Sequence, residues 1–231
     1  MISIGEQKIA ALYCGGAKIK QAYAGSSLVF EAKKPSRLPE GYTEVEYIES
    51  TGTQYINTAI TVTSTSSIDA VIEHTFNSTL TAQYLFGLGQ KSGASTYIFG
   101  IAAYKNNQKI TGRSLTRNIP LLDVSPARKL HYQVLKAGTF IVDGQQLGVV
   151  DSYSYIQFLY IFAYNTAGTA VASNFCSAKL YSFDIKKDDG SYLRQFVPCV
   201  NPENQVGLYD LANANFYANS GTGAVQAGPA V

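Results

Sequence analysis

Apolar and polar residues alternate along most of this chain, and glycine-containing turns interrupt the alternation every few residues. A period of two places apolar side chains on one face of a β-strand. Helical spacing is almost absent, so the pattern predicts an all-β protein. Beyond residue 40, the candidate strands are Tyr42–Glu49, Gln54–Asn57, Ser67–Phe76, Tyr84–Leu88, Thr96–Tyr104, Leu130–Lys136, Thr139–Val142, Gln145–Val150, Phe158–Ala163, Ala178–Lys186, Leu193–Cys199, Gly207–Asp210 and Asn215–Tyr217.

Polar turn sequences separate these strands. A single sheet of about a dozen strands would leave one apolar face in water, so the spacing predicts two sheets packed as a sandwich. The run Phe158–Phe162 is continuously apolar and is expected to lie centrally in a sheet. The turn sequences are Ser50-Thr51-Gly52, Lys136-Ala137-Gly138, Asp143-Gly144, Asp188-Asp189-Gly190 and Asn219-Ser220-Gly221.

The first thirty residues contain a ten-residue repeat, in which Gly5, Gly15 and Gly25 each begin a short polar turn. Apolar residues alternate between the turns, which predicts a small antiparallel β meander with strands near residues 1–4, 8–14, 18–24 and 28–32. So small a ribbon is marginal in water. Its apolar face therefore needs a cover: the downstream domain, another copy of the chain or a larger assembly. Candidate residues for attachment or oligomerisation are Tyr13, Ile19, Tyr23, Val29 and Phe30.

A proline-containing segment follows the repeat. Pro35 and Pro39, flanked by charged residues, cannot continue the interior of a sheet. The sequence therefore predicts an attachment or oligomerisation module at residues 1–34, a linker at 35–39 and a long β domain at 40–231.

Composition agrees with a β-rich chain and excludes several partners. Aromatic residues make up 12% of the chain, with 17 Tyr, 11 Phe and no Trp, and charged residues only 15%. The net charge is +2 and no basic stripe is present, so we expect no nucleic-acid partner. The most apolar run, Tyr155–Tyr164, is too short to span a bilayer. The N-terminus lacks the pattern of a secretory signal, so we expect assembly in a cytoplasm.

Cysteine and acidic residues give no metal or cofactor signature. Cys14, Cys176 and Cys199 are scattered without C-x-x-C spacing, which argues against a disulfide framework or a zinc site. Buried free thiols are favoured, although a bond between Cys176 and Cys199 across a sheet stays open. Asp188-Asp189-Gly190-Ser191 offers oxygens to calcium, but hairpin turns use the same residues. We expect no cofactor and no metal site, and no motif supports calcium.

One acidic segment resembles a catalytic signature. Glu44-Val45-Glu46-Tyr47-Ile48-Glu49 is close to the Glu-x-Asp-x-x-Glu pattern of sugar-cleaving enzymes with concanavalin-like folds. Alternation puts Glu44 and Glu46 on one face, whereas Glu49 joins them only with a bulge. Its central residue is Glu, and His74 and His131 have no recognisable nucleophile. We therefore expect a protein that is not an enzyme, with glycan hydrolysis by Glu44, Glu46 and Glu49 as the alternative.

Aromatic and amide residues suggest where a ligand would bind, because sugars stack on aromatic rings and hydrogen-bond to amides and carboxylates. Tyr97, Tyr104, Asn106 and Asn107 form the candidate ligand-binding cluster. A second cluster combines Tyr153, Tyr155 and Tyr164 with Asn165. The alternative for both is a role in the sandwich core and its loops.

Several segments resemble a known family. Residues 47–58 resemble the opening strand pair of laminin-G-like, concanavalin A-like jelly rolls of phage and prophage proteins, and residues 140–147 resemble the hairpin in the middle of these domains. Residues 196–199, 207–211 and 216–223 match their closing pattern. The N-terminal repeat is similar to short modules at the start of phage tail, baseplate and fibre proteins.

These resemblances imply a virion structural protein, a head- or tail-fibre or baseplate-associated subunit assembled in the host cytoplasm. Residues 1–34 would bind other virion proteins, and the chain would form a homo-oligomer. The jelly roll would bind cell-surface or environmental glycans weakly at each copy and firmly through repetition. The alternative within this family is a capsid decoration that binds only protein.

Overall fold

The structure of this protein is a computed structural model. It describes residues 3–4, 7–8, 12–14, 17–19, 21–24, 27–31, 36–74, 82–92, 95–104, 109–115, 117–123, 129–135, 139–149, 156–166, 169–170 and 174–231, in parts of these ranges by the backbone alone. Contacts divide the chain into two compact units, Met1–Arg37 and Leu38–Val231.

The first unit contains three β-hairpins. They pair β1 (Ser3–Ile4) with β2 (Gln7–Lys8), β3 (Leu12–Cys14) with β4 (Ala17–Ile19), and β5 (Gln21–Ala24) with β6 (Ser27–Glu31). Among the described residues, no pairing joins one hairpin to the next. Within the described residues, each repeat thus forms a hairpin of its own.

The predicted attachment residues belong to these hairpins. They fall on the described strands β3 to β6, but their side chains lie outside the described part of the structure. The predicted role in attachment therefore stays a prediction for all five, which are Tyr13, Ile19, Tyr23, Val29 and Phe30.

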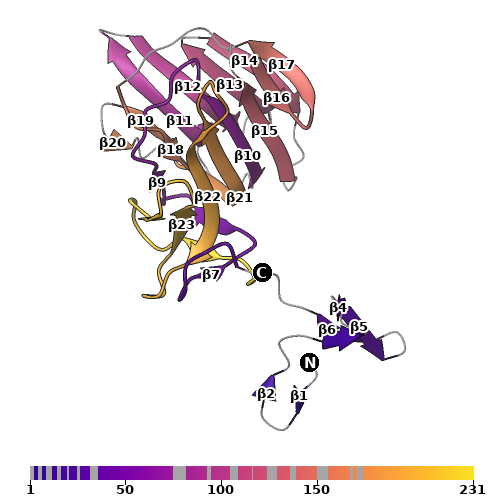
Figure 1. The fold of residues 1–231 in the computed structure, drawn as a ribbon. Coiled ribbons are helices and arrows are strands. Elements are labelled where there is room, and N and C mark those ends of the chain that lie inside the picture. The colour runs from indigo at the N-terminus through magenta and orange to yellow at the C-terminus, as the bar shows by residue number, and fades with distance from the viewer. Residues whose placement is uncertain are drawn as a thin grey trace. The chain divides into compact units, whose positions relative to one another are not determined.

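The second unit is a sandwich of two β-sheets (Figure 1). The larger sheet contains β7 (Thr43–Glu44), β8 (Ile48–Thr51), β10 (Ser67–His74), β15 (Lys129–Leu135), β16 (Thr139–Val142), β17 (Gln145–Val149), β21 (Ser177–Lys186), β22 (Tyr192–Val200), β23 (Val206–Asp210), β24 (Asn215–Ala218) and β25 (Gln226–Ala227). The smaller sheet contains β9 (Ile56–Asn57), β11 (Ala82–Ser92), β12 (Ser95–Tyr104), β13 (Lys109–Leu115), β14 (Arg117–Asp123), β18 (Tyr160–Ile161), β19 (Tyr164–Thr166) and β20 (Thr169–Ala170).

The strand order is not the order of the chain. The larger sheet runs β17-β16-β15-β10-β21-β22-β23-β24, with β8 beside β21, β25 beside β8 and β7 beside β22. The smaller sheet runs β14-β13-β12-β11-β18-β9, with β19 beside β11 and β20 beside β19. The described pairings are antiparallel except that of β11 with β19. The all-β, two-sheet prediction is confirmed, and the arrangement is jelly-roll-like.

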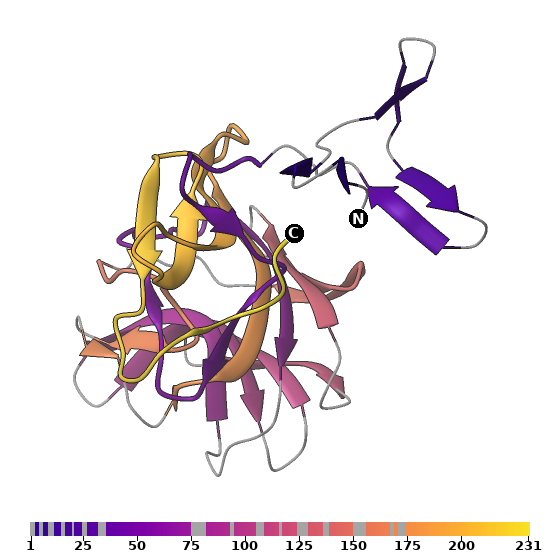
Figure 2. The same cartoon turned by 90° about the horizontal axis from the view of Figure 1, so that it is seen from below.

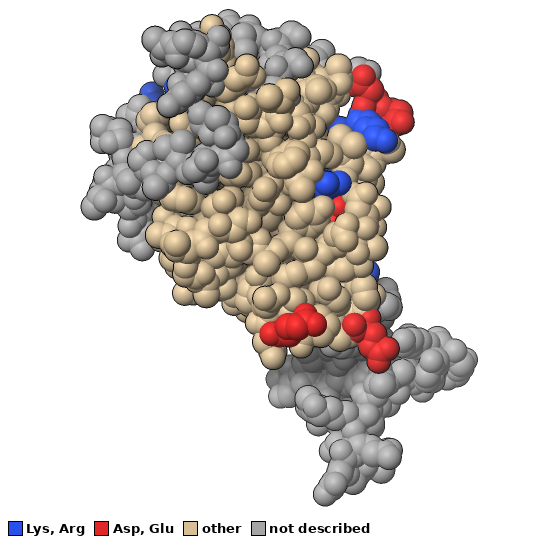
Figure 3. Space-filling model, turned by 90° about the vertical axis from the view of Figure 1, so that its left-hand side faces the viewer, with Lys and Arg blue, Asp and Glu red and all other residues tan. Residues whose placement is uncertain are grey.

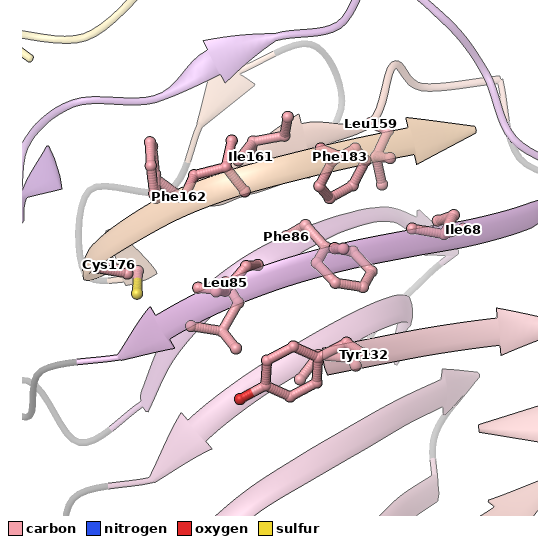
Figure 4. Packing of buried hydrophobic residues seen from close by; sticks show 14 of the residues in the cluster. Ile68, Leu85, Phe86, Tyr132, Leu159, Ile161, Phe162, Cys176 and Phe183 are labelled. Atoms are coloured by element: carbon pink, nitrogen blue, oxygen red, sulfur yellow. The ribbon is translucent and has the colours of Figure 1, made fainter. Parts of the chain in front are cut away.

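The core lies between the two sheets and follows from strand alternation. In β10, Ile68, Ala70 and Ile72 are buried while the residues between them face outward. Aromatic rings join the sheets: Phe86 of β11 and Phe183 of β21 have ring centroids 5.2 Å apart in an edge-to-face arrangement (Figure 4). This single core explains why neither sheet needs a helix to cover its inner face.

The run expected to be a central strand is buried but is hardly a strand. Leu159–Ala163 is buried, yet only Tyr160–Ile161 pairs as β18. Phe162 has a φ of 66°, in the left-handed region, which ends the extended conformation, and Phe158 is 44% exposed. The apolar character of this run therefore predicts its burial correctly, but it wrongly predicts a strand over the whole run.

The candidate strands also omit the hairpin of β13 and β14. Polar residues, one glycine (Gly112) and one proline (Pro120) interrupt the alternation in these two strands. Gly112 shows the reason: a Cβ at this position would lie 2.9 Å from Cε2 of Phe140, so the facing sheet fills the space of a side chain. The packing that selects this residue comes from a distant strand.

The opening and closing motifs of the domain lie side by side. Thr53 Oγ1 donates a hydrogen bond of 2.9 Å to Thr222 O, and Ser220 N donates one of 2.8 Å to Tyr55 O. Further along, β25 pairs with β8, and the yellow C-terminal segment runs beside the purple strands that open the domain (Figure 2). These motifs therefore close the sandwich.

The structure bears on the predictions about the cysteines and about membrane-spanning segments. Cys176 and Cys199 are free and buried, and burial raises the pKa of each thiol. Within the described ranges, no helix has the length and apolarity to cross a membrane.

Candidate functional site

The predicted Tyr–Asn cluster is not assembled by the described residues. Tyr97 and Tyr104 lie on β12, seven positions apart, and so on opposite faces of the smaller sheet. Tyr97 packs against the main core, whereas Tyr104 packs in an outer cluster that contains Tyr84. Asn106 and Asn107 lie outside the described residues. A ligand site at this place stays a prediction.

The described half of the second aromatic cluster is buried. Tyr164 is 9% exposed, with its ring centroid 4.6 Å from that of Tyr84. Asn165 donates a hydrogen bond of 2.9 Å to Phe158 O, which fixes the backbone before β18. These contacts favour the alternative role in packing, while Tyr153 and Tyr155 lie outside the described residues.

The three glutamates of the enzyme-like segment lie on two different strands. Glu44 belongs to β7 and is opposite Cys199 of β22. Glu49 belongs to β8 and is opposite Lys179 of β21. Glu46 is exposed in the bend between the two strands. The pattern thus divides between two strands that pair with different partners, β7 with β22 and β8 with β21, instead of forming one carboxylate-bearing strand.

Among the described residues, parts of the outer face of the larger sheet are covered: Tyr47 packs on Tyr181 of β21, with ring centroids 5.3 Å apart. Leu38 and Tyr42, at the start of the domain, pack on Val197, Cys199 and Tyr209 to form a small second core. The ring centroids of Tyr42 and Tyr209 are 5.0 Å apart in an edge-to-face contact. This cover lies over β22 and β23, and the outward residues of β15, β10 and β21 are half-exposed or exposed.

A row of four polar side chains crosses this open part of the sheet. Gln133 of β15 is opposite Asp69 of β10, Asp69 is opposite Asp184 of β21, and Asp184 is opposite Gln195 of β22. Directly opposite residues share a face of the sheet. Their neighbours along the strands, such as Ile68 of β10, belong to the core. We call these four residues the polar row.

Asp69 orders the polar side chains around it. Gln133 Nε2 donates a hydrogen bond of 2.9 Å to Asp69 Oδ2, and His131 Nε2 lies 2.6 Å from Asp69 Oδ1. The side chains of His131 and Asp69 are 42% and 39% exposed. A carboxylate, an amide and an imidazole are therefore held in fixed relation at the surface.

The rows on either side carry small residues and one exposed ring. In one neighbouring row, Val71 of β10 lies between His131 of β15 and Ser182 of β21. In the other, Lys186 is opposite Tyr192, which is 40% exposed, and Lys186 Nζ lies 4.8 Å from the centroid of the tyrosine ring. Polar atoms, small side chains and an aromatic ring thus meet on one surface.

Beyond Val71, a second row is charged and bonded to itself. Glu73 lies opposite both Lys129 and Lys179, and Lys179 Nζ is 3.4 Å from Glu73 Oε1. Tyr181 donates a hydrogen bond of 2.7 Å to Glu73 Oε2. Lys129 Nζ lies 3.4 Å from the centroid of the Tyr181 ring. Burial and this bond raise the pKa of Tyr181. These mutual contacts make the row a means of holding strands in register.

Charge is not spread evenly over the domain. On the side shown in Figure 3, the described charged side chains gather toward the edges, and the centre of the face is uncharged. Among the described residues, no group of three or more His, Cys, Asp or Glu could hold a metal ion. Among the described residues, we take the polar row and its two flanking rows as the candidate functional site, because they bring half-exposed polar side chains and the exposed ring of Tyr192 onto one surface.

Solved structures include distant likenesses of this chain. No family model matches the chain, and no curated protein matches it in sequence. A proposed carbohydrate-binding protein from Bacteroides ovatus is similar at 9% identity with a TM-score of 0.47, over 81% of this chain and 62% of that one. Trypanosoma rangeli sialidase, in complex with sialic acid, is similar at 15% identity with a TM-score of 0.39, over 52% of this chain. The chain covers 20% of the sialidase. At these scores neither a ligand nor an activity transfers, and the site must be judged by its own residues.

Proposed function

We propose that this protein is a non-enzymatic virion subunit of a bacteriophage, a fibre or baseplate-associated protein that binds glycans on host or environmental surfaces. The sandwich domain would provide the binding surface and residues 1–34 the attachment. The observation that carries the glycan-binding part is the polar row, open to solvent beside the exposed ring of Tyr192.

The chemistry of the polar row suits a sugar. Carboxylates and amides hydrogen-bond to hydroxyl groups, and an aromatic ring packs on the C–H face of a pyranose. Because Asp69 already holds Gln133 and His131, these groups need little ordering when a ligand binds. The residues of the polar row lie on strands of an open sheet face and are half-exposed, so each site is expected to bind weakly.

Weak single sites would act together through the first unit. Repeated copies on one particle raise the effective concentration of each site after the first has bound. The three hairpins would supply this repetition by joining copies of the chain and by contacting other virion proteins. Support for a virion comes from the resemblance of the N-terminal repeat and of the closing motif to phage proteins.

A glycan-hydrolysing enzyme is the less favoured function. Retaining hydrolysis needs two carboxyl groups about 5 Å apart and facing one bond. Glu44 and Glu49 lie on separate strands. Glu49 is opposite Lys179, a cation that would pair with its carboxylate. A decoration that binds only protein remains the third alternative and is separated by the experiment below.

The test exposes the full-length chain to immobilised bacterial and environmental polysaccharides and measures both retention and release of reducing sugar. We expect retention without release. Release that disappears in Glu46→Gln would make the protein an enzyme. A blank panel with the intact oligomer would leave protein binding as its role and refute the proposal.

A further inference from the structure

We infer that Tyr47 and Tyr181 form an oxidative cross-linking site, at which hydrogen peroxide and a peroxidase join the two rings by a carbon–carbon bond. The inference concerns a covalent modification of the sandwich and does not depend on the proposed glycan binding. It follows from the exposure of these two rings and from the groups that the structure places around them.

Tyrosine rings pack against one another at several places in the described part of the sandwich. Tyr42 packs with Tyr209, Tyr47 with Tyr181, Tyr55 with Tyr160 and Tyr84 with Tyr164, at centroid distances of 5.0, 5.3, 4.6 and 4.6 Å. Tyr209, Tyr160, Tyr84 and Tyr164 are buried, so each of these other three pairs has at least one buried ring. Tyr47 and Tyr181 are both half-buried. An oxidant in solution therefore reaches both members of this pair.

The ring of Tyr47 is held in place beside that of Tyr181. A Cβ on Gly228 would lie 2.8 Å from Cδ1 and 2.9 Å from Cε1 of Tyr47, so the backbone of the C-terminal segment packs on one edge of the ring. Lys179 Nζ lies 5.0 Å from the centroid of the same ring. A centroid distance of 5.3 Å is typical of aromatic rings in direct contact. Two tyrosyl radicals formed here would therefore meet without diffusion.

Tyr181 also has an acceptor for its phenolic proton. Its hydroxyl group donates a hydrogen bond of 2.7 Å to Glu73 Oε2. Burial and this carboxylate raise the pKa of Tyr181, so the phenol keeps its proton at neutral pH. Lys129 Nζ lies 3.4 Å from the centroid of the Tyr181 ring, and this cation would repel a positively charged, oxidised ring. The electron and the proton must therefore leave together, and Glu73 is placed to take the proton.

The reaction balances with hydrogen peroxide as the oxidant. Each tyrosine gives one electron to the peroxidase and its phenolic proton to a base, which leaves two neutral phenoxyl radicals. The radicals form one bond between their Cε carbons, and the hydrogen on each of these carbons moves as a proton to the phenolic oxygen. The two electrons and two protons that were removed reduce hydrogen peroxide to two molecules of water. The net change in the protein is the loss of two hydrogen atoms.

The bond would tie the segment that leads into β8 to the distant strand β21. Such a link closes a long loop in the unfolded chain and so lowers the entropy gained on unfolding. A disulfide that closes a long loop stabilises a protein in the same way, and on this scale the linked protein should melt about 5–10 °C above the unlinked one.

The experiment treats the dilute full-length chain with hydrogen peroxide and a peroxidase, digests it with trypsin and measures peptide masses. We expect the peptide Leu180–Lys186, in which Tyr181 is the single tyrosine, to be joined to the peptide of residues 38–91. The mass should be two hydrogen atoms below the sum of the two peptides. Tyr47→Phe and Tyr181→Phe should each abolish this product. Tyr42→Phe, which changes another tyrosine of the same long peptide, should leave it.

Two carboxylate variants test the role of the proton acceptor. Glu73→Gln keeps an acceptor for the hydrogen bond but removes the base, so the product should form at least about tenfold more slowly. Glu49→Gln is the matched control, because Glu49 lies on the other side of Lys179 in the same charged row, and it should leave the rate unchanged. Thermal unfolding should show that all the variants are folded. A product that survives Tyr47→Phe, equal rates in Glu73→Gln and the unaltered chain, or no link to the peptide Leu180–Lys186 overturns the inference.

Discussion

His74 is the clearest example of a residue whose surroundings set its chemistry. It ends β10 with its side chain in the interior, 1% exposed, beside Gln83 of β11. Burial lowers the pKa of His74 from 6.5 to about 4, and the polar side chain of Gln83 offsets part of the effect. The folded state therefore keeps this imidazole neutral where an unfolded chain would already bind a proton.

This difference predicts an acid-sensitive stability. Between pH 6.5 and pH 4 the unfolded state binds more protons at His74 than the folded state, so the free energy of unfolding falls as the pH falls. The loss should reach about 3 kcal/mol over this window. Chemical denaturation at a series of pH values measures it.

A histidine variant makes this prediction specific. His74→Gln removes the titrating group and should flatten the dependence on pH, whatever it costs in overall stability. An unchanged slope in His74→Gln would show that another group is responsible.

Residue identity alone predicts part of the site. Asp69 and Gln133 fall on strands that alternation identifies correctly, and their outward direction follows from the apolar residues beside them. Their proximity does not follow, because β10 and β15 are 55 or more positions apart in the chain and their register is set by packing. The predicted tyrosine and asparagine cluster combines residues close together in the sequence, and two of its members, Tyr97 and Tyr104, lie on opposite faces of the sheet.

At the scale of elements, the sandwich depends on the contact between its opening and closing motifs. Gly221 shows how tight this contact is: a Cβ at this position would lie 2.3 Å from Thr53 O. The neighbouring segment adds hydrogen bonds from Asn219, whose Nδ2 donates to Gly223 O at 2.9 Å. Both motifs can be recognised in the sequence, but their pairing with each other can only be seen in the structure.

Gly221→Ala should therefore loosen the closing contact. The new methyl group would meet a backbone oxygen that cannot turn away, and we expect a loss of about 1–3 kcal/mol in the free energy of unfolding. Ser220→Ala, at an exposed neighbouring position, should have a much smaller effect. Equal unfolding midpoints for the two variants would mean that the loop moves aside without cost.

Sequence alternation predicts some strands of the sandwich better than others. The regular alternation of β10 and β21 made them visible, since one face is buried and the other is not. The sequence does not predict the hairpin of β13 and β14, in which Gly112 takes the place of a larger side chain because Phe140 fills the space. The left-handed backbone of Phe162 ends β18 earlier than the apolar run predicts. In each case a contact with a distant strand outweighed the local pattern.

At the scale of the whole molecule, the two units differ in how they are built. The sandwich has a continuous core, whereas the first unit consists of two-stranded hairpins, which are marginal in isolation. The proposed function therefore predicts that copies of the chain complete the first unit.

Deletion of residues 1–34 should convert an oligomer into a monomer while leaving the melting temperature of the sandwich nearly unchanged. Light scattering coupled to size-exclusion chromatography gives the mass, and calorimetry gives the melting temperature. Phe30→Ser in the full chain should weaken association in the same direction. A full-length chain that is monomeric at high concentration would contradict the proposed assembly.

The contact between Thr53 and Thr222 joins positions 169 residues apart. A nascent chain on the ribosome cannot form it until nearly all of the sandwich has been synthesised. Until then, the apolar faces of the early strands stay exposed to solvent. Folding that depends on pairing between such remote segments is slow. Synthesis speed and chaperone supply, more than final stability, should therefore set the yield of native protein, and chains terminated before the closing motif should be the ones that aggregate.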